Sequence, residues 1–165
     1  MYKRQELNKH VKRPIHPFSS TKEILQAVPK NAKVFAKLEA VHGYFQLGMD
    51  KTSSKILTFL LPQGKFRYLG APMGLNASSD EWCCQPDVLI RGIPWAKKIV
   101  DDTLISTEDM DQLMGRTRII LGWCRQHNIR ISGKKLELGS KINFAGHINY
   151  LSRRNSTRRR KIFSN

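Results

Sequence analysis

Two adjacent carboxylates, Asp101 and Asp102, stand within one of the most apolar runs of the chain. They interrupt the segment from Ile99 to Ile105, where a strand would normally exclude charge. One interpretation is a tight turn, because aspartate tolerates turn geometry and its side chain hydrogen-bonds to nearby backbone. The other is a metal site, because Mg²⁺ prefers oxygen ligands. The pair alone leaves both open.

A third carboxylate, Glu39, favours the metal site. It follows the apolar segment 34–38, which predicts a short strand leading into a glycine-containing turn at residues 42–44. Acids that converge from the ends of two strands suit a pair of divalent ions about 4 Å apart, an arrangement that activates an attacking oxygen and stabilises a leaving one. The three acids therefore indicate phosphoryl transfer.

The acids must be positioned by a hairpin, because adjacent residues of a continuous strand face opposite ways. We predict strands at residues 98–100 and 103–105, joined by a turn made of Asp101 and Asp102. Such a turn would direct both carboxylates to one side of the sheet.

The rest of the chain alternates between helix and strand patterns. Ser20 starts a short helix that Pro29 closes, and a longer helix is expected from Ser78 to before Gly92. Hairpins are predicted at residues 56–69 and 141–150. Ser106 or Thr107 is expected to cap a further helix. The predicted core stripe of that helix consists of Met110, Leu113, Met114, Ile120, Leu121 and Cys124.

Taken in order, the motifs resemble a known family. They are Gln5-Glu6-Leu7-Asn8-Lys9, Pro14 to Pro17, Phe35-Ala36-Lys37-Leu38-Glu39-Ala40 with Gly43-Tyr44-Phe45-Gln46, Phe66-Arg67-Tyr68 with Ala71-Pro72-Met73-Gly74-Leu75, Ile99-Val100-Asp101-Asp102, Lys134-Lys135 and Phe144-Ala145-Gly146-His147. Their order is similar to that of the reverse transcriptase of gypsy-type LTR retrotransposons, from about residue 5 to about residue 148.

The resemblance implies an α+β fold: a polymerase palm whose small antiparallel sheet is backed by two helices, with partial fingers and no thumb. Residues 1–33 would be the partial fingers segment and its connection, and residues 34–150 the palm. Residues 151–165 are expected to form a basic, disordered tail, since they show neither helical nor strand spacing.

The resemblance also implies an activity, RNA-directed DNA polymerisation. Deoxynucleoside triphosphates would be added to a primer on an RNA or DNA template with the help of two Mg²⁺ ions, or Mn²⁺. Glu39, Asp101 and Asp102 would be the catalytic residues and the metal ligands. The nucleotide-binding residues would be Tyr44, Met73, Gly74 and Lys135, and the primer grip would consist of Phe144, Ala145, Gly146 and His147.

Three of the four proposed nucleotide-binding residues have an alternative interpretation. Tyr44 could exclude a ribose 2′-hydroxyl with its ring or could be a core aromatic residue. Gly74 permits close approach of a nucleotide to the backbone, but an ordinary turn explains it nearly as well. Lys135 could protonate the departing pyrophosphate, could hold template phosphates, or could be a solvated surface charge.

Two departures from the family bear on activity. The family usually has aspartate at the position of Glu39, and a displacement of about 1 Å can cost ~100-fold in rate. Ile99 replaces the usual aromatic residue, so we expect an altered primer contact. One hypothesis is therefore a polymerase with impaired activity. The alternative is a catalytically dead retrotransposon remnant that only binds nucleic acid through its basic surface.

The charge of the chain favours a polyanionic partner under either hypothesis. Lysines and arginines number 29 against 13 acidic residues, giving a formal net charge of +16. Six of the positive charges lie in residues 151–165, so the rest of the chain also carries a clear positive excess. Neutralised phosphates release counterions, which predicts salt-sensitive binding to nucleic acid.

The remaining composition indicates the compartment. Cys83, Cys84 and Cys124 have neither a disulfide nor a zinc-binding spacing. No apolar stretch approaches the ~20 residues of a membrane span, and the N-terminus lacks a signal peptide. We expect an intracellular protein, cytoplasmic or nuclear, that is not secreted and has no membrane partner. The sequence makes no prediction about oligomeric state.

Overall fold

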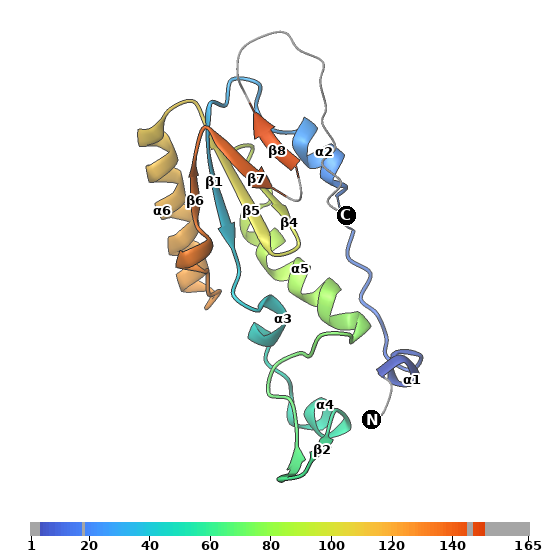
Figure 1. The fold of residues 1–165 in the computed structure, drawn as a ribbon. Helices are drawn as coiled ribbons and strands as arrows, with labels where there is room; N and C mark the ends of the chain where they lie inside the picture. The colour runs from blue at the N-terminus through green and yellow to red at the C-terminus, as the bar shows by residue number, and fades with distance from the viewer. Residues whose placement is uncertain (1–3, 18, 145–146, 151–165) are drawn as a thin grey trace, which may run out of the picture.

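A four-stranded antiparallel sheet forms the centre of the protein (Figure 1). The computed structural model describes residues 4–17, 19–144 and 147–150. Within them the strand order is β4-β5-β1-β6. The strands are β1 (Val34–Glu39), β4 (Ala96–Ile99), β5 (Asp102–Thr107) and β6 (Glu137–Gly139). Because β1 lies between β5 and β6, its residues 35–37 are paired on both edges, whereas its C-terminal residue Glu39 is paired with β5 alone, at one end of the sheet.

Two long helices cover one face of the sheet. They are α5 (Asn76–Ile90) and α6 (Met110–Gln126), and the apolar side chains between helices and sheet form the larger core. Its buried members include Ala36, Leu38, Trp82, Ile105, Leu113 and Ile120. The alternation along β1 produces this face, since Ala36 and Leu38 point to the helices. The predicted arrangement of a small antiparallel sheet backed by two helices is confirmed.

A smaller core lies on the opposite face. Helix α2 (Thr21–Gln26) and a hairpin of β7 (Lys141–Phe144) and β8 (His147–Tyr150) pack there. Ile24, Phe35, Leu104 and Phe144 are its buried contacts. Glu39 and Asp102 point to the same side as Phe35 and Leu104, at the end of the strands, where they keep partial exposure. The acids therefore lie at the border of this core.

A second group of elements lies beyond that end of the sheet, at the bottom of Figure 1. It contains α3 (Gly43–Gln46), α4 (Lys51–Ile56) and the two-stranded hairpin β2 (Phe59–Leu61) and β3 (Gly64–Phe66), with α1 (Arg4–Asn8) nearby. An isolated bridge between Gly48 and Gly70 ties the group together. A Cβ at Gly70 would lie 2.3 Å from the Phe45 carbonyl oxygen, so this close approach requires glycine.

The hairpin predicted at residues 56–69 is shorter than expected. Ile56 ends α4, and pairing is limited to Phe59–Leu61 with Gly64–Phe66. Helix α4 begins because the Asp50 carboxylate accepts hydrogen bonds from the backbone N–H groups of Thr52 and Ser53. The segment has no apolar stripe, so its sequence does not predict this helix. The turn expected at residues 42–44 is also different, since Gly43 begins α3.

The expected cap of α6 is wrong. Ser106 and Thr107 belong to β5, and Asp109 caps the helix by accepting from the Gln112 backbone N–H at 2.8 Å. The core stripe is confirmed at Leu113, Ile120 and Cys124, but Met110 and Met114 are 44% and 38% exposed. Both methionines therefore lie on the solvent-facing side of the helix, in its first half.

The remaining helix predictions hold closely. Ser20 caps α2 in a reciprocal capping box with Glu23. Helix α5 starts at Asn76, two residues before the expected Ser78, and includes Pro86. The hairpin predicted at residues 141–150 is confirmed as β7 and β8. Among the described helices, none combines the length and apolar character needed to cross a membrane.

Candidate active site

Glu39 and Asp102 lie directly opposite each other on neighbouring strands. The antiparallel register pairs Glu39 of β1 with Asp102 of β5, and Asp102 with Ile99 of β4. Opposed residues of an antiparallel pair share one face, with Cβ atoms about 5 Å apart. Like charges placed in this way destabilise a sheet, so the pair marks a position where charge is not explained by folding.

The turn between β4 and β5 is shifted by one residue from the prediction. Its two residues are Val100 and Asp101, whereas Asp102 is already the first residue of β5. Val100 has a φ of 50°, a left-handed conformation that is unfavourable for a β-branched residue. The apolar run had suggested that both acids formed the turn. The observed turn instead places Asp101 beside the sheet and Asp102 on its face.

Asp101 is held at two points. Its backbone carbonyl accepts a hydrogen bond from the Ala40 N–H at 3.1 Å. Its Oδ1 accepts from the indole Nε1–H of Trp82 at 2.6 Å. Trp82 belongs to α5 and is 1% exposed. The role of Trp82 is not predictable from the sequence, because its contact with Asp101 joins positions 19 residues apart and no local pattern indicates such a contact.

Glu39 is paired with the lysine that the resemblance singled out. Lys135 lies in a short 3-10 helix, η1 (Gly133–Lys135), and its Nζ is 2.5 Å from Glu39 Oε1. The Ser132 N–H donates to the Glu39 carbonyl at 2.8 Å, which brings η1 alongside the end of β1. The structure therefore brings Glu39 and Lys135 together, as both were expected to lie in the site.

A second lysine borders the acids and was not predicted. Lys37, two residues before Glu39 on the same face of β1, binds Glu137 of β6 at 2.7 Å. The hydrogen bond to Glu137 is the main cause of the raised pKa of Lys37, and the same bond lowers the pKa of Glu137. A fixed ammonium group thus stands beside the carboxylates.

The pKa of Asp102 is raised in this crowded group of carboxylates. Burial raises its pKa above the ordinary aspartate value, the Lys37 ammonium opposes this rise, and the carboxylates of Glu39 and Asp101 add to it. A cation among these groups would relieve the repulsion, and carboxylate oxygens suit Mg²⁺. The chemical type of these ligands, carboxylate oxygen, therefore fits a hard divalent ion.

The side chains are not gathered around one point, however. Within the described part of the chain, no group of three or more His, Cys, Asp and Glu side chains is arranged to hold a metal ion. Glu39 is engaged by Lys135, and Asp101 by Trp82. The acids occupy adjoining positions at the end of the sheet, with two of the three bound to protein partners.

The loop before α5 contains the other expected nucleotide-binding residues. Met73 is 51% exposed, and Gly74 has a φ of 84°, a conformation that glycine adopts without strain. Tyr44 lies in α3, half-buried against the larger core. Its neighbour Gly43 is buried, and a Cβ there would lie 2.6 Å from Asp101 Oδ1. Tyr44 therefore both packs against the larger core and lies next to the acids.

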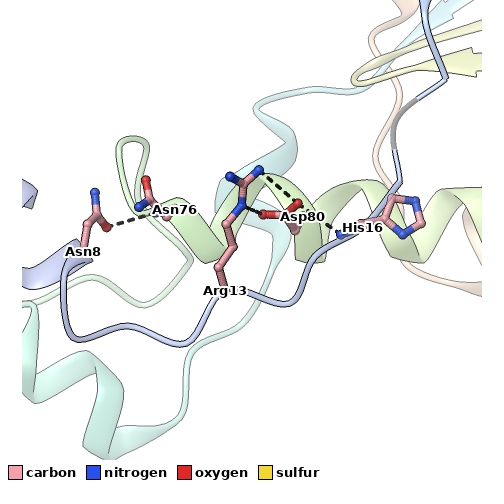
Figure 2. Close-up of polar contacts among 5 residues, drawn as sticks. All are labelled: Asn8, Arg13, His16, Asn76 and Asp80. Carbon is pink, nitrogen blue, oxygen red and sulfur yellow. Dashed lines mark hydrogen bonds and ion pairs between the residues drawn. The ribbon is translucent and has the colours of Figure 1, made fainter.

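Residues 8–16, which we call the strap, bind the loop before α5 and α5 itself through hydrogen bonds and an ion pair (Figure 2). The Asn8 side chain donates to the Gly74 carbonyl at 2.9 Å and accepts from the Asn76 N–H at 3.0 Å. Arg13 binds Asp80 at 2.5 Å, and the His16 N–H also donates to Asp80. The Arg13 guanidinium holds the pKa of Asp80 below its usual value. Asn8 thus joins the Gly74 carbonyl to the first residue of α5.

The expected primer grip is only partly described. Phe144 is completely buried against Phe35 and Leu104, so its ring supports the sheet and is not exposed to a ligand. The backbone of His147 pairs with Phe144 in the hairpin. Ala145 and Gly146 lie outside the described residues. The hairpin exists as expected, but the role of Phe144 within it is to pack.

Known proteins share this sequence pattern. The sequence matches the family described as "Reverse transcriptase (RNA-dependent DNA polymerase)" over residues 2–149. The "Enzymatic polyprotein" of Cauliflower mosaic virus (strain D/H) is 28% identical over 134 residues, and the "Retrovirus-related Pol polyprotein from transposon 412" of Drosophila melanogaster is 22% identical over 146. The alignments cover 76% and 87% of this chain but 19% and 12% of those proteins. The chain thus spans less than a fifth of the length of these relatives.

Solved structures share the fold. The foamy viral protease-reverse transcriptase in complex with RNA/DNA hybrid superposes with a TM-score of 0.82 at 20% identity, covering 89% of this chain and 20% of that one. The native prototype foamy virus enzyme gives 0.77 at 19% identity, with 89% and 20% covered. The chain has the palm and fingers fold of these enzymes. With a sequence match over residues 2–149 of 165, the protein belongs to the reverse transcriptase family.

Proposed function

We propose that the chain is an RNA-directed DNA polymerase domain of a gypsy-type retrotransposon, which adds deoxynucleotides to a primer on an RNA or DNA template. One observation carries the proposal. Glu39 and Asp102 are opposed across β1 and β5, and Asp101 is in the turn beside them. Like charges opposed in this way destabilise a sheet, whereas phosphoryl transfer by two metal ions requires carboxylates gathered at one place.

The residues would act in distinct ways. Glu39, Asp101 and Asp102 would hold two Mg²⁺ ions, or Mn²⁺, which would activate the attacking oxygen and stabilise the leaving one. Lys135, already beside Glu39, would protonate the departing pyrophosphate or hold template phosphates. Glu39 would have to exchange this ion pair for a metal ion. Since an exposed ion pair contributes only up to about 1 kcal/mol, the exchange is energetically accessible.

The neighbouring loop and strap would form the nucleotide pocket. Gly74 would let a nucleotide approach the backbone, with Met73 beside it and Tyr44 excluding a 2′-hydroxyl. Asn8 supports this role, because it binds both the Gly74 carbonyl and the Asn76 N–H. We assign residues 1–33 to a partial fingers segment with its connection and residues 34–150 to the palm.

A primer–template duplex would be the main partner. The net charge of +16 favours a polyanion, and foamy viral relatives of the same fold have been solved with RNA/DNA hybrid and with double-stranded DNA. The hairpin of β7 and β8 would contact the primer, through residues other than the buried Phe144.

A second candidate follows from the ion pair of Glu39. A glutamate whose carboxylate is bound to Lys135, in a site whose acids are not arranged around one point, also suits a remnant without catalytic activity. Such a protein would bind nucleic acid through its basic surface and incorporate nothing.

Primer extension separates the two candidates. A DNA primer on an RNA template is incubated with Mg²⁺ and deoxynucleotides, using the wild-type chain, Glu39→Asp and Asp101→Asn. Extension that requires Asp101 supports the polymerase, and a faster Glu39→Asp variant would identify the longer side chain as the cause of impairment. Duplex binding without extension in all three folded proteins supports the remnant.

A further inference from the structure

We propose that Trp82 is a positioning residue for Asp101: its buried indole N–H fixes one carboxylate oxygen and so presents the other to a metal ion. The proposal rests on the polymerase function inferred above. Trp82 itself would touch neither metal ion nor nucleotide.

The hydrogen bond between the two residues has the features of a fixed support. Nε1 and Oδ1 are 2.6 Å apart, and Trp82 is 1% exposed within the larger core. Hydrogen bonds to an ionised acceptor are short and about twice as strong as those between neutral groups. The indole has no acceptor atom and one donor, so its direction is set by the packing of α5 against the sheet.

Gly43 closes the space around this contact. A Cβ at position 43 would lie 2.3 Å from Trp82 Cε2 and 2.6 Å from Asp101 Oδ1. The backbone of α3 is therefore packed directly on both partners. Neither the indole nor the carboxylate can shift toward α3, which restricts Asp101 to the observed orientation.

The backbone by itself would not provide this restriction. The Ala40 N–H holds the Asp101 carbonyl at 3.1 Å, so the main chain of the turn is anchored to the end of β1. A carboxylate on a two-residue turn still rotates about its own side-chain bonds. Trp82 restricts that rotation, and with Oδ1 engaged by the indole, Oδ2 would be the metal-facing atom. Groups that orient a metal ligand in this way commonly affect metal affinity 10- to 100-fold.

A purely structural explanation makes a different prediction. A buried indole N–H needs an acceptor, and Asp101 could simply supply one. Loss of the bond would then reduce the stability of the fold and leave the affinity for a metal ion unchanged. Affinity and stability must therefore be measured separately.

The first measurement needs no metal ion. The chain has three tryptophans, so a proton–nitrogen correlation spectrum shows three indole resonances, and Trp82→Phe identifies the one from Trp82. Asp101→Asn removes the charged acceptor from a surface turn without changing its size. We expect the Trp82 resonance to move upfield in this variant while the other two stay in place. An unchanged Trp82 resonance would overturn the proposal.

The second measurement is the affinity of the metal-free protein for Mn²⁺, followed by electron paramagnetic resonance. Trp82→Phe keeps an aromatic ring and loses the donor. Trp95→Phe is the matched control, because the Trp95 ring lies under the Arg116 guanidinium. We expect Trp82→Phe to weaken Mn²⁺ binding about tenfold or more, and Trp95→Phe to stay within about twofold of the wild type. Thermal melts of both variants establish that they are folded.

The outcomes distinguish this proposal from the one on which it rests. Wild-type affinity in Trp82→Phe, together with weak binding by Asp101→Asn, would overturn the role of Trp82 and leave the metal site intact. Absence of Mn²⁺ binding in the wild type and Trp95→Phe alike would overturn both proposals. If Trp82→Phe does not fold, Trp95→Phe and Trp123→Phe assign the Trp82 resonance by elimination, and an unchanged Trp82 resonance in Asp101→Asn overturns the proposal.

Discussion

The carboxylates of the site differ in how strongly the protein already holds them. Glu39 is bound by an exposed side chain, since 60% of the Lys135 side chain is accessible, whereas Asp101 is bound by a buried indole. Exposed ion pairs exchange readily, while buried hydrogen bonds persist. Metal binding at this site would therefore change the partner of Glu39 and keep that of Asp101.

Replacing Lys135 tests the competition for Glu39. Lys135→Gln should free the Glu39 carboxylate and strengthen Mn²⁺ binding up to about fivefold, because an exposed ion pair is worth at most about 1 kcal/mol. The adjacent Lys134→Gln is the matched control for the loss of one charge. Titration with Mn²⁺ measures both. Equal affinities in the two variants would show that the ion pair does not oppose metal binding.

Gly43 offers a second test at single-residue resolution. Gly43→Ala would force a methyl group into the indole and the carboxylate, and overpacking of this kind costs about 1–3 kcal/mol in the free energy of unfolding. Gly48→Ala serves as control, because a Cβ there meets nothing within 4 Å. Urea unfolding compares them. Equal stability of the two variants would mean that Trp82 and Asp101 can move to accommodate the methyl group without loss of stability.

At the scale of elements, local signals were predictable and long-range ones were not. The capping box of α2 and the alternation of β1 are encoded within a few residues, and both elements were predicted. The turn at Val100 and Asp101 was missed by one residue, because the strand register depends on pairing with β1 and not on the apolar run. Asn8 and Gly74 are 66 residues apart, so their contact has no local signature.

The ion pair between the N-terminal segment and α5 should make the stability of the fold depend on pH. Arg13 keeps the pKa of Asp80 low, so the ion pair stabilises the fold above the usual aspartate pKa and is lost as pH falls through the lowered value. Arg13→Met should lower the melting temperature by several degrees at pH 7, and the difference from wild type should shrink toward pH 3. The neighbouring Lys12→Met provides the control.

Thermal melts across this pH range measure the difference. A gap between Arg13→Met and the wild type that stays constant down to pH 3 would show that Asp80 does not contribute through its charge.

The whole molecule combines the reverse transcriptase fold with a large positive charge. The family and fold were predictable, because ordered motifs survive at low identity, and the foamy viral enzyme superposes at a TM-score of 0.82. The state of the acids was not predictable, since it depends on side chains from β1, α5 and η1 that meet only in the folded protein.

The salt dependence of nucleic-acid binding should have two contributions, one from residues 151–165 and one from the rest of the chain. Deleting residues 151–165 removes six positive charges, so the slope of log affinity against log salt should become shallower by up to about five. Residual binding is expected, because the remaining chain keeps a positive excess. Fluorescence anisotropy with a labelled duplex at several salt concentrations measures the slope. Complete loss of binding on deletion would assign all affinity to these residues.

The bond between Arg13 and Asp80 also limits how the protein can be divided. The Asp80 side chain is fully buried, and its charge is compensated by residues that precede the sheet. A fragment that began at β1 would contain every strand of the sheet and still enclose a carboxylate without its partner, an arrangement that strongly destabilises a fold. The segment that contains Arg13 and His16 therefore stabilises the buried part of α5, and an expression fragment should retain it.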